Sequence, residues 1–135
     1  MSRQYIQPPE LFESAPLGFT QVVKAPAGAT LYLSGQGAFD RKFQLIGGDD
    51  VSAQTRQALA NVASALAAAS AGIGDLTSLR IYVVDYSPRA AMAIGGCLRA
   101  FFDGAPLPAQ TLVGVQALGV PGMRVEIEAM AVVGG

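Results

Sequence analysis

The chain has 135 residues, a length that suits one domain with a core of ordinary size. It is 51% hydrophobic and 14% charged, with a formal net charge of −1. This weak and unclustered charge argues against a nucleic-acid partner, because no basic stripe is present to neutralise phosphates. The high apolar content predicts that part of the surface is buried between subunits.

The residue types exclude several kinds of chemistry. The sequence has no histidine and one cysteine, Cys97. The usual base of Ser-His-Asp and Cys-His catalysis is therefore missing, as is the commonest ligand of transition metals. We interpret Cys97 as a buried, inert thiol, and we expect no metal. Because the opening residues carry no apolar signal-peptide core and no stretch is apolar enough to cross a bilayer, we expect a cytoplasmic protein without a membrane partner.

Proline and glycine divide the chain into short elements. Residues 1–16 are expected to form an irregular lead-in to a single domain that covers residues 1–135. The alternating residues 19–24 and the strand 30–34 are predicted to pair as a hairpin around the turn at 25–28. Further strands are expected over 43–46, 79–84, 110–117 and 124–133.

Two segments predict helices. The first covers residues 50–71, with Asp50 or Ser52 as its N-cap and Gly72 as the glycine that ends it. The second has Ser87 as N-cap and Pro88 at its first position, and it continues to about residue 102. Two consecutive glycines, Gly95 and Gly96, weaken the middle of this second helix.

The resulting order, β-β-(β)-α-β-α-β-β, predicts an α+β domain with two helices on one face of a mixed sheet. In the last strand Val125 and Ile127 alternate with Glu126 and Glu128, so one face is apolar and the other carries carboxylates. The face opposite the helices still needs a cover, and a partner subunit is the simplest one.

An ordered set of segments resembles the RidA family, also called YjgF/YER057c/UK114. The segments are, in chain order, LGFTQVV, YLSGQ, QTRQALANVASALAAAS, LRIYVVDYS, AFF, LPAQT and RVEIEAMAV. The resemblance implies a chorismate-mutase-like fold and a homotrimer with its sheets facing inward. It also implies that small-molecule ligands bind in clefts between subunits, where imines and enamines are hydrolysed without a cofactor.

The family's site positions carry both retained and altered residues in this sequence. The arginine that clamps a substrate carboxylate falls on Gln110, which offers neutral hydrogen bonds but no charge. A tyrosine and a cysteine of the family fall on Phe19 and Leu112, and an asparagine falls near Gly95. Ser34, Gly35 and Glu126 are retained. We therefore expect Glu126 to act as a general base or as an acceptor that positions water, and Gln110, Ser34, Gly35, Phe19 and Leu112 to contact the ligand.

Each of these residues also has a structural interpretation. Glu126 could instead pair with Arg124, Arg80 or a cation of another subunit, and Glu128, on the same face, could take either role. Arg80 could supply a cation to the ligand or serve as a salt-bridge partner. Gln110 could be a solvated residue at a strand edge, and the hydroxyl of Ser34 could make a structural hydrogen bond.

The sequence thus predicts a trimeric hydrolase of the imine or enamine deaminase type, acting on a less anionic substrate than is usual for the family. The alternative is a non-catalytic trimer that binds a small metabolite or regulates another protein. Some relatives are called endoribonucleases, but the lack of histidine and of a basic stripe disfavours that activity here.

Overall fold

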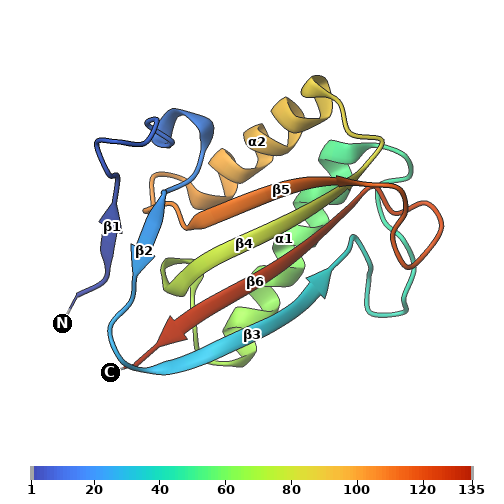
Figure 1. Ribbon diagram of the computed structural model, residues 1–135. Helices are drawn as coiled ribbons and strands as arrows, with labels where there is room; N and C mark the ends of the chain where they lie inside the picture. The colour runs from blue at the N-terminus through green and yellow to red at the C-terminus, as the bar shows by residue number, and fades with distance from the viewer. Residues whose placement is uncertain (1, 135) are drawn as a thin grey trace.

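The computed structural model describes residues 2–134 and contains a four-stranded sheet with two helices on one face (Figure 1). Across the sheet the strands are β3 (Ala29–Gln36), β6 (Val125–Val133), β4 (Leu76–Val84) and β5 (Ala109–Val115). β6 is antiparallel to both of its neighbours, whereas β4 and β5 are parallel. The helices are α1 (Val51–Ala68) and α2 (Pro88–Phe102), and α2 connects the parallel pair. The predicted α+β class and the mixed sheet are confirmed.

The core lies between the helices and one face of the sheet. β6 contributes Val125, Ile127, Ala129 and Ala131, each at most 2% exposed. Ile81 and Val83 of β4 and Leu59, Val62 and Leu66 of α1 pack against them. Because strand side chains alternate, the residues between these, among them Glu126 and Glu128, lie on the opposite, open face.

Side chains cap the start of both helices. Asp50 Oδ1 accepts hydrogen bonds from the backbone N–H groups of Ser52, at 2.9 Å, and Ala53, at 3.3 Å. Ser87 Oγ accepts one from Ala90 N at 3.0 Å, with Pro88 at the first helical position. The predicted end of α1 is wrong. The left-handed residue is Ser70, with φ 56°, and the turn closes through a bond from Ala71 N to Leu66 O.

The N-terminal segment forms a separate two-stranded sheet. β1 (Gln4–Ile6) pairs with β2 (Val22–Lys24), and β3 pairs with β6 instead (Figure 1). The predicted hairpin between residues 19–24 and 30–34 is therefore wrong, since residues 25–28 carry the chain from one sheet to the other. Residues 2–16 contain β1 and the start of the 3-10 helix η1 (Ala15–Leu17).

The chain between β3 and α1 is a tight loop. The strand expected over residues 43–46 reduces to one bridge between Phe39 and Leu45, which closes a hairpin turn. A second 3-10 helix, η2 (Ile73–Asp75), precedes β4, which begins at Leu76, earlier than predicted. Within residues 2–134, no helix combines the length and the apolar character that a membrane span requires.

Candidate functional site

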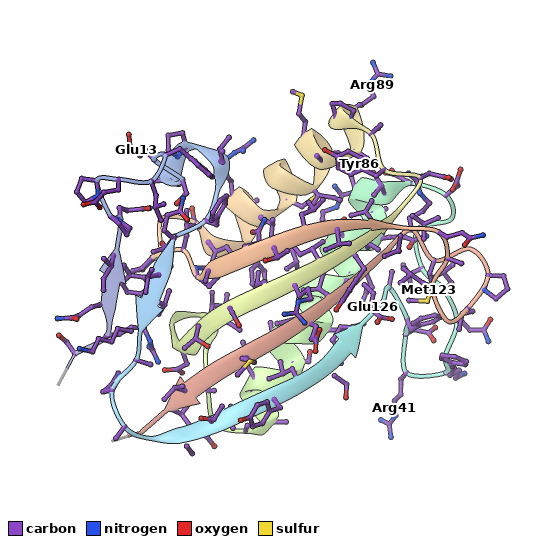
Figure 2. The ribbon with its side chains drawn as sticks, viewed as in Figure 1. Glu13, Arg41, Tyr86, Arg89, Met123 and Glu126 are labelled. Atoms are coloured by element: carbon purple, nitrogen blue, oxygen red, sulfur yellow. The ribbon has the colours of Figure 1, made fainter. Side chains whose placement is uncertain are left out.

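Glu126 is a half-buried carboxylate on the open face of β6, beside the end of β3 (Figure 2). Its carboxyl group lies over Gly35, where an added Cβ would stand 2.5 Å from Glu126 Oε2. The missing side chain of Gly35 is therefore what makes room for the carboxylate. Ser34 precedes this glycine and is exposed. The structure thus brings Gly35 and Glu126 into one cavity, whereas Ser34 lines a neighbouring hollow with Tyr32.

Glu126 is not held in a salt bridge by any described residue. Arg124, one of its proposed partners, donates to Val84 O at 3.1 Å and pairs with Asp49 at 3.5 Å. Arg80, the other, lies 3.8 Å from Glu128. These contacts do not support an ion pair of Glu126 with either arginine, and Glu126 lines a cavity.

Glu128 has the opposite environment. Tyr82 Oη donates a hydrogen bond to Glu128 Oε1 at 3.0 Å, and Arg80 Nη1 lies 3.8 Å from the same oxygen. The side chains of Arg80 and Glu128 are about half exposed, so their attraction adds little to stability, but each charge offsets the other. Of the two carboxylates, Glu126 is therefore the one without a charged partner among the described residues.

Gln110 stands at the start of β5 and lines two hollows. The first, of about 360 Å³, brings Gln110 together with Phe19, Arg80 and Glu128. The second, of about 350 Å³, lies on the helix side of β5 and contains Gln110, Leu112, Gly95 and Arg99. Gln110 and Leu112 share that face because they are in register with the core residues Leu79 and Ile81. Leu112 is therefore on the far side of the sheet from Glu126.

Arg99 is a candidate binding residue that the sequence reasoning missed. It lies on α2 against the glycine pair: a Cβ at Gly95 would be 3.5 Å from Arg99 Nη1, and one at Gly96 would be 3.9 Å from Nη2. No described residue forms a salt bridge with it. The signal was available, since Gly95 and Arg99 are four residues apart and so share one face of a helix.

The candidate residues fall into two groups at opposite edges of the sheet. Phe19, Gln110, Leu112 and Arg80 lie at or beside the β5 edge, whereas Ser34, Gly35 and Glu126 lie at or beside the β3 edge. The two edge strands are separated by β6 and β4, which places them about 14 Å apart at the usual strand spacing. One copy of the chain does not bring the two groups into a single pocket.

The comparisons with known proteins identify the family. The family model described as Endoribonuclease L-PSP matches residues 12–133. The chain belongs to the Endoribonuclease L-PSP family. A relative from Salmonella typhimurium, named 2-iminobutanoate/2-iminopropanoate deaminase, is 34% identical over 123 residues, which are 89% of this chain and 93% of the relative.

Solved structures agree with the assignment to the L-PSP family. A Rid-family protein of unknown function from Yersinia pestis has a TM-score of 0.94 and 41% identity, with 98% of this chain and 100% of that chain covered. A member of the YjgF/YER057c/UK114 family from Mycobacterium tuberculosis has a TM-score of 0.65 and 31% identity, covering 98% and 100%. The resemblance to the RidA family is thereby confirmed.

Proposed function

We propose that this L-PSP protein hydrolyses small imines or enamines in a cleft formed by two copies of the chain. The observation that carries the proposal is Glu126, a half-buried carboxylate that lies over Gly35, faces a cavity and forms no salt bridge with a described residue. The related deaminase activity named for the Salmonella relative supports the same reaction class.

The proposed reaction requires a water molecule and a proton acceptor. Glu126 would hold the water by a hydrogen bond and accept its proton while the oxygen bonds to the imine carbon. The electron pair of the C=N bond moves to nitrogen, which takes the proton held by Glu126 and gives a carbinolamine. Glu126, again a carboxylate, then receives the hydroxyl proton and passes it to nitrogen as the C–N bond breaks, so that one water and one imine yield one carbonyl compound and one ammonia.

Residues at the β5 edge would orient the substrate and determine which substrate charge the site prefers. Gln110 can donate neutral hydrogen bonds, and the charge of Arg80 is offset by Glu128. Replacing a charge-assisted, bidentate contact by a neutral one costs about 1.5–3 kcal/mol of binding. We therefore propose a substrate less anionic than a 2-imino acid, with Arg99, which lines the same hollow as Gln110, as the cation that would still support slower turnover of 2-imino acids.

A closed ring of copies, most simply a homotrimer, would join the two edges. The open face of the sheet carries Tyr32, which is 77% exposed, and Met130, which is 37% exposed. Apolar groups that are this accessible favour a protein partner on that face. Packing identical copies in a ring would cover the face and set the β3 edge of one copy against the β5 edge of the next.

The test is a panel of imines generated in situ. Butan-2-imine lacks a carboxylate, and 2-iminobutanoate carries one; both are formed by an oxidase, and the appearance of the ketone is recorded with and without the protein. We expect the protein to hydrolyse butan-2-imine faster than 2-iminobutanoate. Glu126→Gln should lower the rate of hydrolysis by about a hundredfold or more, since this change removes the proton acceptor and keeps the shape of the side chain. Binding of butanone without acceleration of either imine would contradict the proposal and favour the non-catalytic alternative.

A further inference from the structure

Two aromatic rings form one wall of the cavity that contains Glu126. Phe39 and Phe43 stack with their centroids 4.7 Å apart and their planes 29° apart. Both line a cavity of about 810 Å³ together with Met123 and Glu126. Phe43 remains 66% exposed, so the stacked pair leaves an apolar surface open. Such a surface can be covered by another flat apolar group.

The backbone of Phe43 is in a conformation that phenylalanine adopts rarely. Its φ is 64°, in the left-handed region. Phe43 N bonds to Asp40 O at 3.1 Å, and Asp40 N bonds to Gln44 O at 3.0 Å, which gives a hairpin loop over residues 41–43. Glycine or asparagine is the usual third residue of such a loop, because a Cβ in this conformation crowds the backbone. The turn alone therefore does not explain why residue 43 is a phenylalanine. Residues in strained backbone conformations are common at ligand sites, which favours a binding role for this side chain.

Two glycines set the spacing between the rings and the carboxylate. The carboxyl group of Glu126 lies over Gly35, as described above. An added Cβ at Gly37 would be 2.7 Å from Met123 Cε and 2.9 Å from Phe39 Cε2, so these side chains lie over Gly37. Two residues of extended chain span about 7 Å. A ring bonded to an imine carbon would reach the aromatic pair while the carbon stays beside a water held by Glu126.

Two charged residues, Asp40 and Arg41, also line the cavity beside the rings. Asp40 Oδ1 accepts hydrogen bonds from Lys42 N and Gln44 N, both at 2.9 Å. Arg41 extends from the loop away from Glu126 and Met123 (Figure 2). This wall is thus suited to an uncharged group.

We propose that Phe39, Phe43 and Met123 form a subsite for an aryl group attached to the imine carbon of the substrate. The inference rests on the proposed hydrolysis at Glu126 and specifies its substrate class as aryl imines. Phe43 would cover one face of the substrate ring, and the methyl group of Met123 would contact its edge.

The experiment compares two imines that lack a carboxylate, acetophenone imine and butan-2-imine, each generated from its amine by an oxidase. The ratio of their kcat/KM values is measured for the wild type, Phe43→Asn and the matched control Tyr86→Asn. Tyr86 is 53% exposed and lies outside the residues that line the cavity (Figure 2). We expect the wild type to prefer the aryl imine and Phe43→Asn to lower the ratio about three- to tenfold, while the control keeps it.

Phe43→Asn is expected to fold, because asparagine tolerates the left-handed conformation of residue 43. Phe43→Gly is the second variant, since glycine adopts the same conformation without strain. An unchanged ratio in both Phe43 variants would overturn the subsite. If neither of these imines is hydrolysed, saturation-transfer NMR with acetophenone decides the subsite separately, and the proposed function fails if 2-iminobutanoate is not hydrolysed either. Binding to the wild type that both variants lose would retain the subsite, whereas absent or unaffected binding would overturn it.

Discussion

Gly35→Ala tests the catalytic placement of Glu126 without removing the carboxylate. The new methyl group would stand 2.5 Å from Glu126 Oε2, 2.8 Å from Cδ and 2.9 Å from Cγ. All three atoms belong to one side chain, which can move. Gly35 does not have a positive φ, so alanine fits its backbone.

The size of the effect follows from these distances. Non-bonded carbon atoms prefer separations of about 3.5–4.0 Å, so the carboxyl group must retreat by about 1 Å. Misplacing a reacting group by about 1 Å can cost a hundredfold in rate, which corresponds to about 2.7 kcal/mol in the transition state. Stability should change little, because a compatible Gly→Ala change gains about 0.4–1 kcal/mol from the unfolded chain.

The assay is kcat/KM for butan-2-imine, followed through butanone, with thermal unfolding measured in parallel. Gly74→Ala is the matched control, since an added Cβ there meets nothing within 4 Å. We expect Gly35→Ala to lose about a hundredfold in kcat/KM and to keep its midpoint within a few degrees, with no change in the control. Full activity in Gly35→Ala would refute the reasoning that the position of Glu126 over this glycine matters for catalysis.

Three further changes probe the binding edge and the stability of the fold. Gln110→Arg should raise the preference for 2-iminobutanoate over butan-2-imine by about ten- to a hundredfold, and an unchanged ratio would show that Gln110 does not meet the substrate. Arg99→Gln should lower turnover of 2-iminobutanoate about three- to tenfold and spare butan-2-imine; equal losses for the two would point to a structural role instead. Gln54→Leu should lower the free energy of unfolding in urea by about 3–5 kcal/mol, because buried Gln54 satisfies three backbone groups at 2.7, 2.8 and 2.9 Å. A loss below about 1 kcal/mol, the level expected for the more accessible Gln57→Leu, would contradict that account.

Local sequence signals predicted the helices and the two faces of the sheet. Asp50 and Ser87 are capping residues with an acceptor of the right length, and both make the predicted contacts. The alternation around Glu126 assigned the core face correctly, since it depends only on strand geometry. The end of α1 was missed because Ser70, instead of a glycine, adopts the left-handed conformation.

The larger errors concern contacts between distant parts of the chain. The partner of residues 30–34 is β6, a hundred residues away in the sequence, and no local pattern encodes that choice. Likewise, alternation within β5 groups Gln110 with Leu112 but does not tell which face of the sheet they occupy. That face is fixed by register with β4 and brings Arg99 of α2 into the same hollow as Gln110. The role proposed for Phe43 depends on a loop conformation that its residue type disfavours, so residue propensity did not indicate it.

The separation of the candidate residues onto two edges has a genetic consequence. If each cleft combines the β3 edge of one subunit with the β5 edge of the next, a subunit damaged at one edge still offers an intact edge to its neighbour. Two inactive variants, one damaged at each edge, would therefore restore activity when unfolded and refolded together. Random assembly of equal amounts into closed rings makes about a quarter of the clefts intact. Loss-of-function alleles that alter cleft residues and leave folding and assembly intact would accordingly sort into two complementing groups, which follow the two edges of the sheet and not the order of residues in the chain.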